Sequence, residues 1–274
     1  MSDLVSAHQR ADFERDGAVH LPGVLAPGPL ARLAAETDRI LDEETGPPGG
    51  DDNFKRLGYW RANATFRAVL TASPVPGIAA QLLRATKLNL LYDQLFIKEA
   101  GSRTPTAWHN DLPYWPLTGT QALTVWLAFD RIVEANGALE FLRASHLWGR
   151  RYRPFYSADD GWVSHFFHAD ANDDFDDLPD FTATRGERDI VSWDLAPGDA
   201  IAFHALTVHG APGNRRPDMG RRAYAVRFAD EDVRYRAGPV WNLDLVNESL
   251  RDGDPLDSEQ FPVVYRGAGT SARD

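Results

Sequence analysis

The sequence contains no cysteine and very little lysine, and the first of these shortages restricts the chemistry that it can support. No cysteine occurs among its 274 residues, so neither a disulfide framework nor a thiolate metal site can form. Any bound metal must therefore be held by histidine, aspartate or glutamate, and eight histidines are available. Lysine stands only at positions 55, 87 and 98, so arginine carries most of the basic charge.

Positive charge and long apolar runs are also scarce. The net charge is −11 and no basic stripe is visible, which argues against a nucleic acid as partner. No stretch of about 18 uncharged apolar residues occurs, and the N-terminus lacks the basic and apolar regions of a secretion signal. We therefore expect a soluble, cytoplasmic protein that does not bind membranes, while the composition leaves its oligomeric state open.

What the sequence does contain is enough apolar material for one large core. Hydrophobic residues make up 43% of the chain and aromatic residues 11%, which favours a single domain over residues 1–274. The 18 prolines and 22 glycines are scattered rather than clustered. Frequent turns of this kind are typical of a mainly β protein rather than of a helical bundle.

Helical periodicity is confined to the first third of the chain. The first predicted helix ends at Gly17, a residue suited to the left-handed conformation that stops a helix, and a short strand is expected at 18–21. Residues 46–52 combine glycine, proline and aspartate and predict a surface loop; a domain linker is the alternative, but too little chain precedes it for an independent core. The predicted helices lie at 7–16, at about 30–44 and at 75–84.

From residue 88 onward the pattern changes to short strands separated by turns. Such spacing favours a jelly roll, the double-stranded β-helix of cupin-like proteins, with the N-terminal helices flanking it. Residues 150–188 interrupt the series with aromatic and acidic residues, and we interpret this insertion as a lid over a site. The predicted strands lie at 88–98, 122–130, 138–142, 189–194, 199–203, 206–209 and 223–229.

His109 and Asp111 form the pair of residues that points most directly to chemistry. On a strand, positions i and i+2 project from the same face, so an imidazole and a carboxylate can reach one ion there. A third ligand must come from another strand, and His209 follows 98 residues later (209 − 111 = 98). Two histidines and one carboxylate are the facial set of non-haem iron oxygenases. Alone, however, a His-x-Asp pair is a weak signal, because most such pairs are surface residues or helix caps.

The remaining histidines are weaker candidates. His204 would point to the opposite face of a regular strand from His209, so we reject it as a ligand. His146 is interpreted as a hydrogen-bonded structural residue. His165 and His168 lie in the insertion and are alternatives for lining a pocket.

Several motifs occur in a fixed order along most of the chain, from about Phe13 to about Phe228. They are Phe13-Glu14-Arg15-Asp16-Gly17, His109-Asn110-Asp111-Leu112-Pro113-Tyr114-Trp115-Pro116, Asn136-Gly137-Ala138-Leu139, Ala144-Ser145-His146, Pro197-Gly198-Asp199, and His209-Gly210 with Asn214 and Arg221-Arg222. In this order and spacing they resemble the phytanoyl-CoA dioxygenase (PhyH)-like family of Fe(II)/2-oxoglutarate-dependent oxygenases.

The resemblance implies a set of roles for individual residues. It implies that Fe(II) is bound by His109, Asp111 and His209, and that Arg221 pairs with the distal carboxylate of 2-oxoglutarate. Relative to the family pattern one extra residue precedes Arg221, so Arg222 competes for that role, and Ala211 stands where relatives often have a serine that binds the cosubstrate. The further cosubstrate contacts that the resemblance implies are Gln94, Trp126 and, from a looser match, Lys55.

Asp111 bears on the type of reaction. Related halogenases lack this carboxylate and so leave a coordination position for halide, whereas its presence here favours hydroxylation with release of succinate and CO2 from 2-oxoglutarate and O2. The same fold and iron centre also support desaturation, ring closure or epimerisation, and a non-catalytic metal-binding cupin-like protein is a further alternative.

Substrate identity is less constrained than the metal site. Tyr114 and Trp115 follow the His-x-Asp motif closely and are candidates for a substrate wall, although aromatic residues in a β core more often serve packing. Nothing in the insertion suggests a cradle for coenzyme A. We therefore expect a small-molecule metabolite as substrate.

Overall fold

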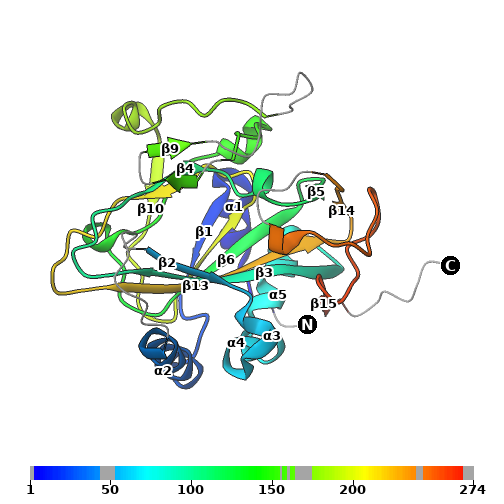
Figure 1. Cartoon of the computed structure of the whole chain (residues 1–274), viewed down its shortest axis with the longest axis horizontal. Helices are drawn as coiled ribbons and strands as arrows, with labels where there is room; N and C mark the ends of the chain where they lie inside the picture. The colour runs from blue at the N-terminus through cyan, green and yellow to red at the C-terminus, as the bar shows by residue number, and fades with distance from the viewer. Residues whose placement is uncertain are drawn as a thin grey trace.

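Two facing antiparallel sheets form the centre of the computed structural model of the chain. The structure describes residues 3–43, 53–154, 156–158, 161–163, 175–238 and 243–267. The larger sheet has the strand order β1-β11-β6-β13-β3-β15, with β2 also paired to β3, and the smaller sheet has the order β10-β7-β12-β4 (Figure 1). This arrangement confirms the predicted double-stranded β-helix.

The larger sheet is antiparallel at every pairing, and its longest strands are β3 and β13. In an antiparallel sheet, one face can pack against a layer of helices while the other faces the barrel interior. Its strands are β1 (Ala18–Leu21), β2 (Asn53–Leu57), β3 (Lys87–Lys98), β6 (Ala122–Ala128), β11 (Ala200–His204), β13 (Arg221–Asp230) and β15 (Val263–Arg266).

The smaller sheet consists of short strands, and it carries the histidines of the candidate metal site. Two further antiparallel pairs lie outside both sheets: β5 (Leu117–Thr118) with β14 (Arg234–Tyr235), and β8 (Tyr156–Ala158) with β9 (Gly161–Val163). The strands of the smaller sheet are β4 (Thr106–His109), β7 (Glu140–Leu142), β10 (Ile190–Ser192) and β12 (His209–Ala211).

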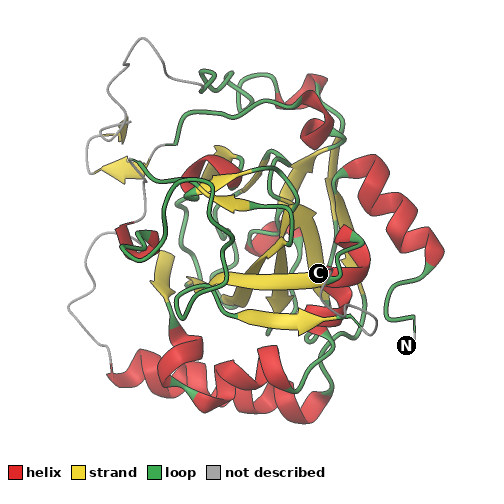
Figure 2. Ribbon diagram, turned by 90° about the vertical axis from the view of Figure 1, so that its right-hand side faces the viewer, coloured by secondary structure: helices red, strands yellow, loops and turns green. Residues whose placement is uncertain are grey.

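Helices from the first third of the chain pack outside the barrel (Figure 2). The first ends where predicted, because Gly17 adopts a φ of 80° and its N–H bonds to the carbonyl of Phe13. A capping box between Ser6 and Gln9 closes its other end. The helices are α1 (Ala7–Asp16), α2 (Pro27–Glu43), α3 (Tyr59–Ala62), α4 (Ala64–Thr71) and α5 (Val75–Leu83).

Alternation along β13 separates two cores. Tyr224, Val226 and Phe228 pack against the helices, whereas Ala223 and Ala225 belong to a second cluster on the inner face. Alanine has a short side chain, so these two positions of β13 add little bulk between the two sheets.

Some predicted boundaries were wrong. The strand expected at 206–209 begins only at His209, and β4 ends at His109, before Asp111. The strand β2 and the helices α3 and α4 were not predicted, because their segments are short and take their stability from packing on β3 and on neighbouring helices. In the described part of the chain, no helix has both the length and the apolar character needed to cross a membrane.

Candidate metal and cosubstrate site

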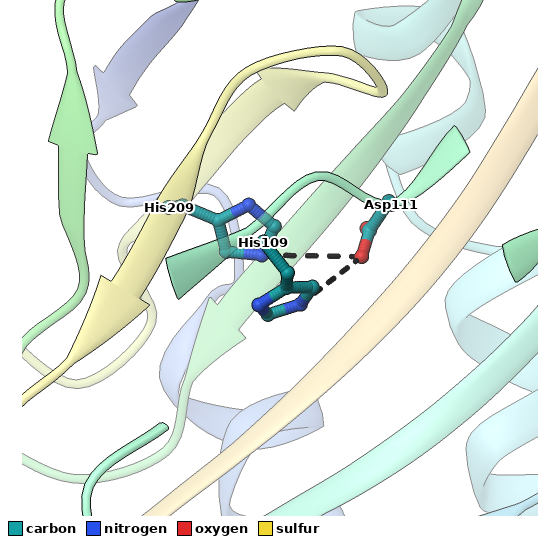
Figure 3. A group of neighbouring side chains, drawn as sticks. All are labelled: His109, Asp111 and His209. Atoms are coloured by element: carbon teal, nitrogen blue, oxygen red, sulfur yellow. Dashed lines mark ion pairs between the residues drawn. The ribbon is translucent and has the colours of Figure 1, made fainter. Parts of the chain in front are cut away.

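Three side chains meet between the sheets at one end of the barrel interior: His109, Asp111 and His209 (Figure 3). Their ligand atoms all lie within 4.8 Å of one another. Oδ1 of Asp111 is 3.6 Å from Nε2 of His109 and 3.9 Å from Nε2 of His209. Two imidazole nitrogens and one carboxylate oxygen at these separations can bind a single divalent ion of the first transition series.

The two histidines are brought together by strand pairing. In the smaller sheet His209 of β12 lies directly opposite His109 of β4, and their ring centroids are 4.3 Å apart. Asp111 reaches the same point by a different route from the one predicted. The strand ends at His109, and Asp111 adopts a helical conformation (φ −73°, ψ −38°) at the start of a short 3-10 helix. A turn of the backbone, rather than strand alternation, therefore directs its carboxylate to the histidines.

Backbone hydrogen bonds hold both imidazole rings in one orientation. Nδ1 of His109 lies 2.8 Å from the carbonyl of Ala107, and Nδ1 of His209 lies 3.0 Å from the carbonyl of Thr207. A carbonyl can only accept, so each Nδ1 must carry the proton. Each Nε2 is then left with a free lone pair directed at the shared point, which is the tautomer that a metal requires.

The two oxygens of Asp111 have different surroundings. Oδ2 accepts a hydrogen bond of 2.8 Å from Oγ1 of Thr124 and lies 3.8 Å from Nε of Arg227, whereas Oδ1 faces the two histidines. Burial by itself would raise the pKa of Asp111, but the nearby imidazoles of His109 and His209 and the positive charge of Arg227 lower it below its ordinary value. The carboxylate is thus ionised and ready to bind a cation.

Burial has the opposite effect on His209. It lowers the pKa of this imidazole to about 4, and the nearby His109 acts in the same direction. His209 is therefore neutral near pH 7, which keeps its Nε2 available as a ligand.

Arg221 is a buried cation on the same inner face of the larger sheet. It is 3% exposed, its guanidinium lies over the ring of Trp126 at 5.2 Å, and Nη1 donates to the carbonyl of Gly137. Nε has no hydrogen-bond partner, and no carboxylate among the described residues pairs with the side chain. Burial lowers the pKa of Arg221 to about 10. A buried guanidinium without a counter-ion is suited to binding an anionic ligand.

Arg222, the competing residue, points the other way. Its guanidinium forms a bidentate pair with Asp130, with hydrogen bonds of 2.7 and 3.0 Å, and also contacts Asp38. These carboxylates raise the pKa of Arg222. Because neighbouring residues of a strand face opposite sides, only Arg221 of this pair faces the barrel interior.

The remaining predicted cosubstrate contacts lie on the strands that form the inner face. Trp126 is buried in β6 beneath Arg221, and Gln94 lies half-buried in β3, opposite Ala225 of β13. Lys55 lies in β2, and its backbone pairs with Phe96 of β3. Its side chain lies outside the described part of the structure.

The two predicted substrate-wall residues have different environments. The ring of Tyr114 stands edge-on to His109, with centroids 5.7 Å apart, so it borders the metal site. Trp115 is fully buried in a hydrophobic cluster, and its Nε1–H donates to Oη of Tyr92 at 2.9 Å. Its contacts are those of a core residue that positions Tyr92.

The other histidines that the structure describes do not join the metal cluster. His204 packs on the helical side against Phe13 and His146, with ring centroids 6.5 and 5.4 Å away. It thus faces away from the metal ligands, as expected when it was rejected as a ligand. His146 lies 3.2 Å from the carbonyl of Glu14, in agreement with a structural role. His165 and His168 lie outside the described residues.

Two neighbours of the site, Thr124 and Arg227, were not anticipated from the sequence. Both contact the carboxylate of Asp111 from the larger sheet. Strand alternation could have indicated them, because Thr124 shares a face with Trp126 two positions on, and Arg227 shares one with Arg221 six positions earlier.

A double-stranded β-helix that carries two histidines and a carboxylate, together with a buried unpaired arginine, defines an iron- and 2-oxoglutarate-dependent dioxygenase. Comparison with known proteins gives the family. The family model described as Phytanoyl-CoA dioxygenase (PhyH) matches residues 13–223, and the chain belongs to this family.

Individual relatives agree with this assignment. The peroxisomal phytanoyl-CoA dioxygenase of Rattus norvegicus is 24% identical over 253 residues, which cover 85% of this chain and 71% of the relative. The solved structure of the epimerase SnoN with Fe3+, alpha ketoglutarate and nogalamycin RO is 27% identical, with a TM-score of 0.70 and coverage of 94% of this chain and 97% of the other. For the carbocyclase SnoK the identity is 25%, the TM-score 0.73 and the coverage 94% and 96%.

Proposed function

We propose that this dioxygenase is a single-domain enzyme that hydroxylates a small-molecule metabolite, with iron held by His109, Asp111 and His209. The observation that carries the proposal is the convergence of three correctly oriented ligand atoms in a barrel that also buries an unpaired Arg221. When bound, Fe(II) and 2-oxoglutarate supply the oxidising power, with release of succinate and CO2 from 2-oxoglutarate and O2.

The ligand set fits iron on chemical grounds. Both Nε2 atoms offer lone pairs, and Asp111 offers Oδ1 while Oδ2 is engaged by Thr124. Three ligands on one side leave the opposite side open for a cosubstrate and oxygen. Because the carboxylate of Asp111 would fill the coordination position that a halide needs, hydroxylation is favoured over halogenation.

Arg221 orients the cosubstrate in this proposal. Its guanidinium binds the distal carboxylate of 2-oxoglutarate and so gains the counter-ion that the protein itself does not supply. Trp126 supports the guanidinium from below, and Gln94 and Lys55 are proposed as further contacts with the cosubstrate. The pairing of Arg222 with Asp130 supports Arg221 rather than Arg222 in this role.

Tyr114 and the insertion at 150–188 are proposed to enclose the substrate. Tyr114 borders His109, and Trp115 acts through Tyr92 rather than by contact with substrate. The described end of the insertion docks on the smaller sheet, where Phe181 packs against Trp108 with centroids 6.4 Å apart. A lid anchored beside the metal ligands would exclude water during oxidation.

The decisive experiment supplies anaerobically purified protein with Fe(II) and 2-oxoglutarate and then admits air. Succinate should form, at least slowly, without an added substrate. Asp111→Ala should fold normally and form none, which separates turnover from folding. If no succinate appears and calorimetry with Mn(II) detects no binding of 2-oxoglutarate, the proposal fails.

A second outcome for the same site is desaturation, ring closure or epimerisation. The structures of the carbocyclase SnoK and the epimerase SnoN each match 94% of this chain, and their similarity supports this second outcome. Product analysis by mass spectrometry separates it from hydroxylation, because hydroxylation adds one oxygen atom whereas ring closure and desaturation remove two hydrogens and epimerisation leaves the mass unchanged.

A further inference from the structure

Arg227 is a second buried cation on the inner face of β13, and the cosubstrate role assigned to Arg221 does not use it. It is 4% exposed and stands six positions after Arg221, so the backbones of the two residues are separated by roughly 20 Å along the strand. Its Nε lies 3.8 Å from Oδ2 of Asp111. Arg227 therefore adjoins the metal ligands and is distinct from the arginine assigned to the cosubstrate.

Aromatic rings fix the position of this guanidinium. It lies over the ring of Tyr92 at 4.4 Å and near the ring of Phe96 at 5.7 Å. Tyr92 is itself held by the hydrogen bond from Trp115. Stacking occupies the flat faces of a guanidinium and leaves the N–H groups at its edge free to donate in the plane.

Those edge N–H groups lack acceptors in the protein. Nε and Nη1 of Arg227 are buried without a hydrogen-bond partner among the described residues. Oδ2 of Asp111 is too distant for a hydrogen bond and is already engaged by Thr124. Burying an N–H donor without an acceptor costs free energy. The unpaired N–H groups of Arg227 therefore point to a ligand that supplies the acceptor.

The charges that face the barrel interior agree with this conclusion. They include the carboxylate of Asp111 and the cations Arg221 and Arg227. Of these three charges, one positive charge is in excess. Fe(II) and the dianion of 2-oxoglutarate cancel each other, so the excess persists in the loaded site and favours one more anion.

We propose that Arg227 binds a carboxylate of the substrate, so that the enzyme oxidises a small organic acid at a carbon a few bonds from its acid group. This inference rests on the proposed function. A carboxylate can accept from two neighbouring N–H groups of a guanidinium at once, through the edge that Nη2 shares with either Nε or Nη1. Since Arg227 adjoins Asp111, an acid bound there lies beside the metal position, within reach of the oxidising centre.

The test uses full-length protein loaded with Mn(II) and saturating 2-oxoglutarate, titrated with benzoate and benzamide and with hexanoate and hexanamide. Each pair differs in charge but hardly in shape. The wild type should bind the acids at least about tenfold more tightly than the amides, as expected for a charge-assisted contact. Arg227→Met should remove this preference, and Arg227→Lys should retain part of it. Arg222→Met, on the outer face of the same strand, is the matched control and should leave the preference unchanged.

A second readout follows the visible charge-transfer band of the anaerobic Fe(II)–2-oxoglutarate complex, which the acids should perturb in the wild type and not in Arg227→Met. Equal binding of acids and amides by the wild type, no binding of either, or an unchanged preference in Arg227→Met would each overturn the inference. If Arg227→Met only weakens Mn(II) binding, Arg227 positions Asp111 instead. If the Mn(II)-bound protein does not bind 2-oxoglutarate, the proposed function is refuted. If it binds 2-oxoglutarate but does not prefer the acids to the amides, only this inference is refuted.

Discussion

The two faces of β13 carry arginines in opposite electrostatic situations. On the outer face, Arg222 is paired with Asp130 and Asp38 at the edge of the helical layer. On the inner face, Arg221 and Arg227 are buried, and each leaves guanidinium N–H groups without an acceptor. Adjacent residues of one strand thus differ completely in how their charge is compensated.

We propose that this difference separates residues that stabilise the fold from residues that bind a ligand. On the outer face, Arg222 is paired with Asp130, and the hydroxyl of Tyr224 donates to Asp93 at 2.5 Å. On the inner face, Nε of Arg221 and Nε and Nη1 of Arg227 have no hydrogen-bond partner among the described residues, which fits the proposal that the ligands supply the compensating charge. Substitutions on the two faces should therefore affect different measurements: ligand binding on the inner face, and the free energy of unfolding on the outer face.

The largest expected effect follows from Arg221→Met. Loss of the guanidinium should weaken 2-oxoglutarate binding by about 100-fold or more, since a buried carboxylate would be left without its counter-ion. The unfolding free energy of the ligand-free protein should stay the same or rise, because an unpaired buried charge is removed. Calorimetry with Mn(II) measures the affinity and urea titration the stability. An affinity within threefold of the wild type would contradict the assignment of Arg221.

The next effect concerns pH and the outer-face His204. Burial, together with His146, lowers the pKa of His204 to about 4, whereas in the unfolded chain it is about 6.5. Between these values the unfolded state binds more protons, so stability is complete above about pH 6.5 and is lost as the pH falls toward 4. This one residue should account for about 3 kcal/mol of that loss.

Comparison of the wild type with His204→Asn at pH 7 and pH 4.5 isolates this contribution. Asparagine keeps an acceptor for the N–H of Leu206, which bonds to Nδ1 of His204 at 3.1 Å. Urea midpoints should fall less with pH in the variant than in the wild type. Parallel pH profiles would show that His204 does not titrate as described.

Thr124→Val tests the support of the metal ligand. The substitution keeps the shape of the side chain but removes the hydroxyl that donates to Oδ2 of Asp111. Mn(II) affinity should fall by about tenfold, the lower end of the effect expected for a group that orients a ligand. Thr124→Ser retains the hydroxyl and is the control. Equal affinities in the two variants would remove Thr124 from the site.

The smallest effect is expected for Arg222→Met. Its pair with Asp130 is partly exposed, with 24% and 23% of the two side chains accessible, so solvent screens the interaction. The unfolding free energy should fall by about 0.5–1 kcal/mol. Binding of 2-oxoglutarate should remain within twofold of the wild type. A large loss of affinity would mean that the two faces of β13 are not functionally distinct.

Much of the candidate site could be predicted because strand periodicity and residue type are local properties. The absence of cysteine restricted the ligands to oxygen and imidazole donors, and the spacing made His109, Asp111 and His209 candidates, which the ordered motifs of the family resemblance then supported. The strand assignment at Asp111 was wrong in detail. The 3-10 helix that directs its carboxylate is short and depends on tertiary contacts, including the hydrogen bond from the N–H of Leu112 to the carbonyl of Ala205.

The sequence by itself determined which side chains could bind a metal, the order in which the strands follow one another and the family resemblance, because these depend on residue identity and spacing. Only the tertiary structure decided that Arg221 rather than Arg222 faces the interior, that Trp115 packs in the core, and that Arg227 is buried beside Asp111 without a hydrogen-bond partner. The physical reason is that the face, burial and counter-charge of a side chain are set by strands that are distant in the sequence.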